Sequence, residues 1–324
     1  MPKQCWLIIL SLLFQVKIAY SWGFFGHARI NHYAVYLLPP EMLVLFKPSQ
    51  LFLENHAADP DKRRYIVEDE GPRHYIDLDH YGQFPFDSLP RGWKQACEKF
   101  SEDSLKAHGI VPWHIQVMMA RLTRSFSEHD YAGILKNSAE LGHYVSDAHV
   151  PLHACSNHNG QKTGQRGIHG FWESRIPELL AAKEFNFFIG KAAYLKNPGD
   201  FIWQKVLESA SAADTVLRLE KKLSEQLEGK SKYAFEDRNG KVVKQYSSGY
   251  TIAYNRLLNG MVERRMRESI WAVASCWFTA WVNAGQPDLK QIQQRVFSPE
   301  DQQQFMWLQQ AWQKGNGMLG RNED

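Results

Sequence analysis

Residues 141–174, LGHYVSDAHVPLHACSNHNGQKTGQRGIHGFWES, contain five histidines, and two of these stand four residues before an acidic side chain. The two pairs are His143 with Asp147 and His169 with Glu173. On a helix, residues four apart share one face and lie one turn apart. The spacing therefore predicts two helical segments that each direct an imidazole and a carboxylate to the same side of the chain.

The histidines are also confined to one part of the chain. All 13 lie between residues 27 and 169, and His153 stands close to the first of the two pairs. Solvated or singly buried histidines would be scattered along the sequence, so the clustering favours one site built from many of them. Neutral imidazole nitrogen and carboxylate oxygen are typical zinc ligands. We therefore expect a metal site.

The hydrophobic pattern predicts an all-α fold. Apolar residues recur at helical spacing over residues 115–126 and 131–145. Further helices are expected over residues 206–227, over residues 251–283 and after Pro299. The one clear strand pattern spans residues 233–246, where Asn239-Gly240 predicts the turn of a small β-hairpin. No repeat or linker divides the chain, so we expect a single multi-helix domain, with long loops from Pro48 to Gly92.

Residues 1–21 resemble a secretory signal peptide. Lys3 precedes an apolar run over residues 6–14, and Ala-Tyr-Ser at 19–21 offers a cleavage site. The mature domain is then expected to span residues 22–324 and to begin with Trp22. No other segment is apolar for long enough to suggest a membrane span. We expect a soluble protein that is exported to the periplasm or secreted, without a transmembrane anchor, and monomeric.

Composition adds little about partners. The 324 residues carry a formal net charge of +3, and 23% of them are charged. Lys and Arg are dispersed rather than gathered in one run, so composition alone does not indicate a nucleic-acid-binding surface.

Five segments taken together resemble the zinc-dependent phospholipase C and S1/P1 nuclease superfamily. They are WGFFGH from residue 22, HAADPDKRR from 56, RHYIDLD from 73, GHYVSDAHVPLH from 142 and GIHGFWE from 167. The fourth is similar to the family pattern HxxGDxxQPxH, although Ser146 and Val150 stand where the family has Gly and Gln. The resemblance extends over the whole mature chain and implies an all-helical fold of this type with three clustered zinc ions.

The resemblance also implies the ligands, which are Trp22, His27, Asp59, His74, His143, Asp147, His153, His169 and Glu173. One zinc would take Asp59, His74, His143 and Asp147, and a second would take His153, His169 and Glu173. The third would take His27, Asp147 and the free amino group that cleavage creates at Trp22. Asp61 is the alternative to Asp59.

The resemblance also implies a function, which we state as an expectation. The chain would be an exported zinc-dependent phosphodiesterase in which Asp59 orients a water and Asp147 bridges two ions. Tyr75 and Asp77 are similar to the residues with which the nuclease branch holds a nucleobase, and Asn157 would contact substrate. A nuclease for single-stranded nucleic acid is therefore the first choice. Glu173 matches the phospholipase branch, so a phospholipase C is the alternative, and a non-catalytic zinc-binding protein is the third possibility.

Overall fold

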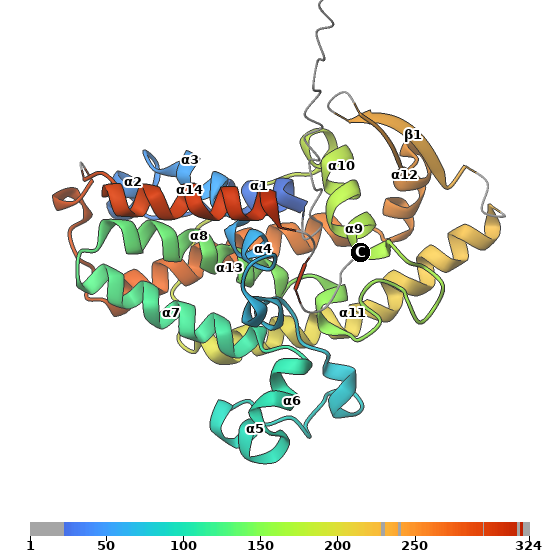
Figure 1. Ribbon diagram of the computed structural model, residues 1–324, viewed down its shortest axis with the longest axis horizontal. Helices are drawn as coiled ribbons and strands as arrows, with labels where there is room; N and C mark the ends of the chain where they lie inside the picture. Colours follow the sequence, from blue (N-terminus) through green and yellow to red (C-terminus); the bar gives the residue numbers. More distant parts are fainter. Residues whose placement is uncertain (1–22, 228–230, 239–240, 294, 316–317, 320–324) are drawn as a thin grey trace, which may run out of the picture.

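The computed structural model describes residues 23–227, 231–238, 241–293, 295–315 and 318–319. This part of the chain is predominantly helical and contains one antiparallel pair of strands (Figure 1). The α-helices are α1 (Gly23–Val35), α2 (Pro40–Phe46), α3 (Gln50–Asn55), α4 (Asp59–Arg63), α5 (Trp93–Phe100), α6 (Glu102–Ala107), α7 (Val111–Ser127), α8 (Tyr131–Asp147), α9 (Ile168–Gly170), α10 (Ile176–Glu184), α11 (Pro198–Gln226), α12 (Ser248–Leu257), α13 (Met261–Asn283) and α14 (Pro299–Lys314). The tighter or wider helical turns are η1 (Glu68–His74), η2 (Leu78–Tyr81), η3 (Pro151–Ala154), η4 (Phe171–Arg175) and η5 (Leu289–Gln291).

The expected all-α class with one small hairpin is confirmed. The signal peptide and Trp22 lie outside the described residues and stay predictions. Among the described helices, none has both the length and the apolar character that crossing a bilayer requires.

The core is built where α13 packs against α1, α7 and α8. From Ser138 to Asp147 every residue of α8 is buried, so this helix is covered on all sides. The Trp277 indole of α13 donates a hydrogen bond to the Ser138 carbonyl at 2.9 Å. A helix that is buried all round can present polar side chains only to other buried groups, and this is where the histidines of α8 lie.

Gly142 lets α1 approach α8 closely. A Cβ at this position would lie 2.0 Å from the Asn31 side-chain oxygen. The Asn31 amide nitrogen donates to the carbonyls of Ala139 and Leu53, both at 3.1 Å, and so joins α1, α8 and α3. Because His27 precedes Asn31 by one turn, the same contact carries His27 towards the last turns of α8.

Several predicted elements are confirmed with adjusted ends. Residues 115–126 and 131–145 lie in α7 and α8, and the hairpin pairs β1 (Tyr233–Arg238) with β2 (Lys241–Tyr246). The predicted turn residues 239–240 lie outside the described residues. The helix expected from residue 206 begins at Pro198, where the Asn197 side chain accepts from the Asp200 backbone nitrogen. The last helix begins after Ser298, which forms a capping box with Asp301.

Two predictions about the elements are wrong. The single helix expected over residues 251–283 is two helices, because Asn259 and Gly260 adopt positive φ angles of 50° and 71° between α12 and α13. The apolar pattern continues across this break, which is why the sequence suggested one helix. The region from Pro48 to Gly92 is also more ordered than long loops, since it contains α3, α4, η1 and η2.

The hairpin packs against η4, the helical turn that follows α9. The Tyr246 ring of β2 stacks on Phe171 with 3.7 Å between centroids. The Arg175 guanidinium donates to both carboxylate oxygens of Glu236 on β1, at 3.0 and 2.9 Å. Phe171 and Arg175 begin and end η4, so the hairpin is anchored on the turn that carries Glu173.

Candidate metal centre

The end of α8 supplies the centre of a buried polar cluster. His143 and Asp147 are both fully buried, and the His143 Nε2 atom lies 3.2 Å from the Asp147 Oδ2 atom. Their spacing of four residues produces this contact, as the sequence predicts. Small side chains beside them, at Gly142 and Ser146, leave room for neighbouring elements to approach.

Three other elements bring side chains to this pair. His74 at the end of η1 places Nδ1 3.0 Å from both Asp147 Oδ2 and His143 Nε2. His27 of α1 stacks on His143 with 3.8 Å between ring centroids, and its Nε2 lies 3.4 Å from Asp147 Oδ1. Asp61 of α4 places Oδ1 3.6 Å from His143 Nε2 and 3.7 Å from His74 Nδ1. Four separate segments therefore converge on one point.

A second group comes from the segment after α8. His153 lies in η3 and His169 in α9, and their Nε2 atoms are 3.1 Å apart. The Glu173 Oε2 atom lies 3.1 Å from His169 Nε2 and 3.4 Å from His153 Nε2. Glu173 lies in η4, a π-helical turn, and such turns occur often at functional sites. The second pair expected from the sequence thus also shares one side of a helical segment.

The outward nitrogens of four imidazoles are held by acceptors away from the cluster. The Nδ1 atom of His143 donates to the Ala57 carbonyl at 2.9 Å, that of His153 to the His74 carbonyl at 2.6 Å, and that of His169 to the His158 carbonyl at 3.2 Å. The His27 Nδ1 lies 2.9 Å from the Ser146 hydroxyl, which itself donates to backbone carbonyls. An imidazole that donates from Nδ1 has its lone pair on Nε2, and here each Nε2 faces the cluster. This is the arrangement that metal-binding histidines adopt.

His74 is turned the other way round. Its Nδ1 faces the cluster, and its Nε2 lies 3.6 Å from the Glu70 carboxylate. Glu70 is fully buried and accepts from Arg63 Nε at 3.2 Å and from Arg73 Nη1 at 2.7 Å, and Tyr144 also donates to it. Glu70 is not among the residues predicted from the sequence. Its position four residues before His74 is the same spacing as in the two recognised pairs, with the order reversed.

The carboxylates of the cluster lack ordinary hydrogen-bond donors. Among the described residues, no side-chain or backbone group hydrogen-bonds to either oxygen of Asp61 or of Glu173, or to Asp147 Oδ1. A buried ionised carboxylate is strongly unfavourable unless it is paired or bound to a metal. Imidazole nitrogens of the cluster also lie 3.0 to 3.1 Å apart, and where both carry lone pairs they repel unless a cation lies between them. Both features fit bound metal ions, so the residues present suit the group that the resemblance implies.

The charges and the burial of the cluster shift the pKa values of its members. Burial by itself would raise the pKa of Asp147, but the neighbouring His143 and His153 outweigh it and hold this pKa well below its usual value. Burial lowers the pKa of His27 well below its ordinary value, which keeps the imidazole neutral and able to bind a metal. Burial raises the pKa of Asp61, although His143 and His74 oppose the effect.

The described residues contain three buried groups that can hold metal ions. They are His27 with Asp61 and His143, then His74 with His143 and Asp147, and finally His153 with His169 and Glu173. Seven of the nine ligands inferred from the sequence are therefore brought together, namely His27, His74, His143, Asp147, His153, His169 and Glu173. Trp22 lies outside the described residues.

The geometry places Asp61, the alternative to Asp59, beside the histidines of the cluster. Asp59 is directed at His56, whose Nδ1 lies 2.6 Å away, and at the Lys62 ammonium, 2.8 Å away. Residues at positions i and i+2 of a helix lie about 200° apart around its axis. Only one of these two aspartates can therefore face α8. Asp61 occupies that side, and Asp59 belongs to none of the three groups.

The residues expected to contact substrate are buried or hydrogen-bonded within their own loops. Tyr75 is 3% exposed and packs against Gly109, and Asp77 is 7% exposed, with its carboxylate 3.8 Å from His108 Nδ1. Asn157 is half-buried and holds its own loop, since its side chain donates to Thr163 at 3.2 Å and accepts from the Lys162 backbone at 2.8 Å. In this arrangement the Tyr75 ring has no open face.

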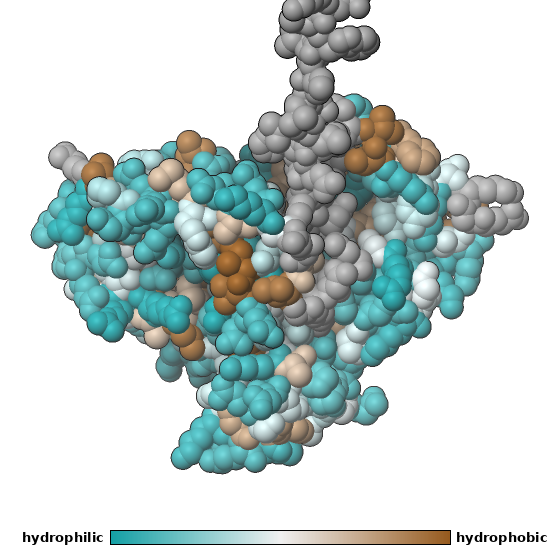
Figure 2. Space-filling view, viewed as in Figure 1, coloured by the Kyte–Doolittle hydropathy of each residue, from teal (hydrophilic) through white to brown (hydrophobic). Residues whose placement is uncertain are grey.

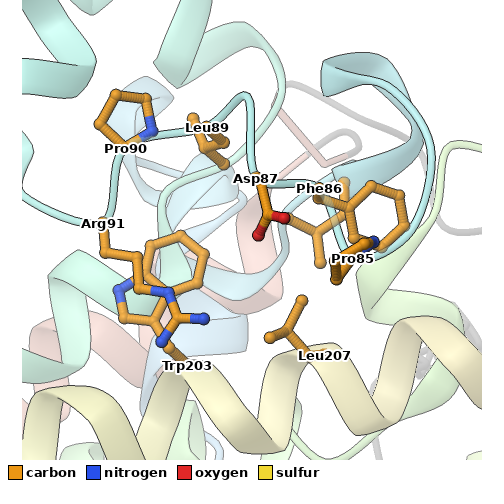
Figure 3. Close-up of a pocket in the computed structure, with 9 residues that line it drawn as sticks. Pro85, Phe86, Asp87, Leu89, Pro90, Arg91, Trp203 and Leu207 are labelled. Carbon is orange, nitrogen blue, oxygen red and sulfur yellow. The ribbon is translucent and has the colours of Figure 1, made fainter.

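A separate cavity should not be confused with this centre. It has a volume of about 240 Å³ and lies between the segment 85–91 and the start of α11 (Figure 3). Figure 3 shows the Arg91 side chain extending towards Trp203 at one end of the cavity, with Asp87 between Leu89 and Phe86. Its lining contains no member of the three groups, so it is not part of the metal centre.

Comparison with known proteins supplies no family. No protein-family model matches the chain. No curated protein matches it significantly. The function is therefore proposed below from the residues themselves and from their resemblance to the superfamily.

Proposed function

We propose that this chain is a zinc-dependent phosphodiesterase of the phospholipase C and S1/P1 nuclease type, exported after removal of residues 1–21. The observation that carries the proposal is the convergence of five buried imidazoles and three buried carboxylates from separate segments of the chain. Structural zinc sites usually have four ligands and are often rich in cysteine. A cluster of this size without cysteine suits a multinuclear hydrolytic centre better.

The ligand sets follow from the geometry together with the resemblance. His74, His143, Asp147 and Asp61 would hold one ion, and His153, His169 and Glu173 a second. A third would be held by His27, by Asp147 as a bridge and by the amino group of Trp22. When bound, such ions acidify a coordinated water and offset the charge that develops on a phosphodiester during in-line displacement.

The chain's own residues would prepare this chemistry. The backbone carbonyls that accept from His143, His153 and His169 orient these rings and keep each Nε2 free of a proton. Burial lowers the effective dielectric constant around the cluster and so strengthens its electrostatic interactions. We assign to Asp61 the water-orienting role expected of Asp59, because its carboxylate lies beside His74 and His143 and accepts no hydrogen bond from a described residue.

Single-stranded nucleic acid is the first substrate in this proposal. It rests on the Tyr75 and Asp77 pattern after His74 and on the short spacing between Trp22 and His27. A base would stack on Tyr75 only after the ring moved from its packed position, and the carboxylate of Asp77 would then meet the edge of the base.

One observation favours phospholipid as the second candidate. The hairpin anchored on η4 exposes Phe235 by 74% and Val242 by 73%. Figure 2 shows a hydrophobic patch at the place where Figure 1 draws β1. Exposed apolar side chains close to the Glu173 turn are what an enzyme that works at a lipid surface would need.

The test is a paired hydrolysis assay on the protein that begins at Trp22. One arm uses single-stranded DNA and RNA, and the other uses phosphatidylcholine in mixed micelles. We expect activity that a chelator removes and zinc restores, and that Asp61→Asn abolishes. The matched variant Asp59→Asn should keep most of the activity. Activity on neither substrate, with three zinc ions bound, would instead support the non-catalytic zinc protein.

A further inference from the structure

A second polar site is separated from the metal centre by Tyr144, which contacts His74 and also lines this site. It is a groove of about 410 Å³ between α4, η1, α7 and α8, elements that Figure 1 shows close together. Its lining consists of Arg63, Arg73, His114, Met118, Arg121, Lys136, Asn137, Glu140 and Tyr144. None of these residues belongs to the three metal-binding groups, so the groove is a separate feature from the metal centre.

The charges that line the groove do not cancel. Arg63 donates to both carboxylate oxygens of Glu140, at 2.7 and 3.0 Å, and this pair is locally neutral. Arg73 pairs through Nη1 with the buried Glu70 at 2.7 Å. Two further cations, Arg121 and Lys136, complete the lining.

Those two cations have no acidic partner in the described part of the chain. The Arg121 Nη1 atom lies 3.8 Å from the Met118 sulfur, and the Lys136 Nζ atom lies 3.5 Å from the Gln304 side-chain oxygen. Arg121 is exposed and Lys136 is half-buried, and like charges that line one groove repel each other to the extent that solvent does not screen them. The groove therefore carries a net positive charge, which comes from Arg121 and Lys136.

His114 adds a buried polar atom. The side chain is 8% exposed, its ring meets Tyr144 edge-on at 4.5 Å, and its Nε2 has no hydrogen-bond partner among the described residues. Buried polar atoms are nearly always satisfied. In the tautomer with its proton on Nε2, this imidazole can donate to a ligand in the groove.

We propose that this groove binds a phosphate group, either as inorganic phosphate or as the phosphate of a small ester such as a nucleoside monophosphate. A guanidinium fork matches two phosphate oxygens, an ammonium adds a point charge, and a neutral imidazole donates one hydrogen bond. Arg121, Lys136 and His114 supply these three groups from two adjacent helices. The inference does not depend on the proposed function, because binding here needs neither metal nor hydrolysis.

Met118 offers a readout confined to the groove. It is 1% exposed and its sulfur touches Arg121, so an anion that draws the guanidinium into the groove changes the surroundings of the methionine methyl. The metal-loaded full chain, labelled with ¹³C at the methionine methyls, is titrated with inorganic phosphate and separately with a nucleoside monophosphate. The Met118 signal is assigned with Met118→Leu. We expect it to shift to saturation, while that of Met42, buried in α2, stays in place.

Variants then link the shift to the two cations. Arg121→Gln with Lys136→Gln should weaken binding at least tenfold. Arg124→Gln is the matched control, because Arg124 lies on the same helix but pairs with Glu128 outside the groove, and it should bind like the wild type. Tighter binding of the monophosphate identifies an ester as the ligand, and equal binding identifies the phosphate group alone. An unmoved Met118 signal, or equal affinity in the double variant, overturns the proposal.

Discussion

Asp61→Asn should make the protein lose metal, whereas Asp59→Asn should not. The two side chains are two residues apart in α4 and differ in what surrounds them. Asp61 is 2% exposed and its oxygens face His74 and His143 without a hydrogen bond from any described residue. Asp59 is held by His56 and Lys62. An amide at position 61 removes a negatively charged ligand and changes little else in shape.

The size of each effect can be worked out. Loss of a ligand should weaken metal binding at least as much as loss of an outer partner of a ligand, which costs about 10- to 100-fold. At about 1.4 kcal/mol per tenfold, a 100-fold loss corresponds to about 2.8 kcal/mol. With zinc in excess, this difference in binding appears as an equal decrease in the free energy of unfolding. Asp59→Asn loses two partly buried polar contacts, about 1 kcal/mol, with or without zinc.

Removal of the metal should reverse the order of stability of the two variants. Burial raises the pKa of Asp61, which means that its ionised form is unfavourable in the folded protein without a metal. At pH 7 in a chelator, Asp61→Asn should therefore be at least as stable as the wild type. Asp59→Asn should remain less stable than the wild type under both conditions.

Denaturant unfolding in zinc and in chelator measures these differences, and elemental analysis gives the ratio of metal to protein. The control is that both variants show the helical circular dichroism of the wild type. If Asp61→Asn keeps the full metal content, or if Asp59→Asn loses as much metal as we expect of Asp61→Asn, the assignment of Asp61 is wrong.

Three further predictions concern the surroundings of the centre. Burial lowers the pKa of His114 to about 3, so the unfolded chain binds a proton near pH 6.5 that the folded protein does not bind. Stability should therefore fall between pH 6.5 and 3, and His114→Gln should reduce that fall by roughly 5 kcal/mol in denaturant melts. Gly142→Ala should destabilise the fold by about 2 kcal/mol, because its Cβ would lie 2.0 Å from the Asn31 oxygen; thermal unfolding at an unchanged midpoint would contradict this. Ser146→Ala removes the partner of His27 Nδ1 and should weaken one metal site about 10- to 100-fold, which competition with a chromophoric chelator measures.

Much of the centre could be predicted because its main pairs are local. His143 with Asp147 and His169 with Glu173 depend only on helical periodicity, which the sequence displays directly. The hairpin and the main helices were predictable for the same reason. The break at Asn259 and Gly260 was missed, because the apolar pattern that packs α12 and α13 into the core continues across it and outweighed the Asn-Gly turn signal.

The sequence by itself determined the helical class, the clustering of histidines and the spacing that joins imidazole to carboxylate. Tertiary structure decided which aspartate of α4 joins the cluster. A helix of five residues is too short to carry a periodic pattern, so only its docking against α8 selects Asp61. The contacts of Glu70 with Arg63 and Tyr144 likewise depend on how η1 packs on α4 and α8. Contacts between elements depend on the packing of the whole core, which short-range spacing does not encode.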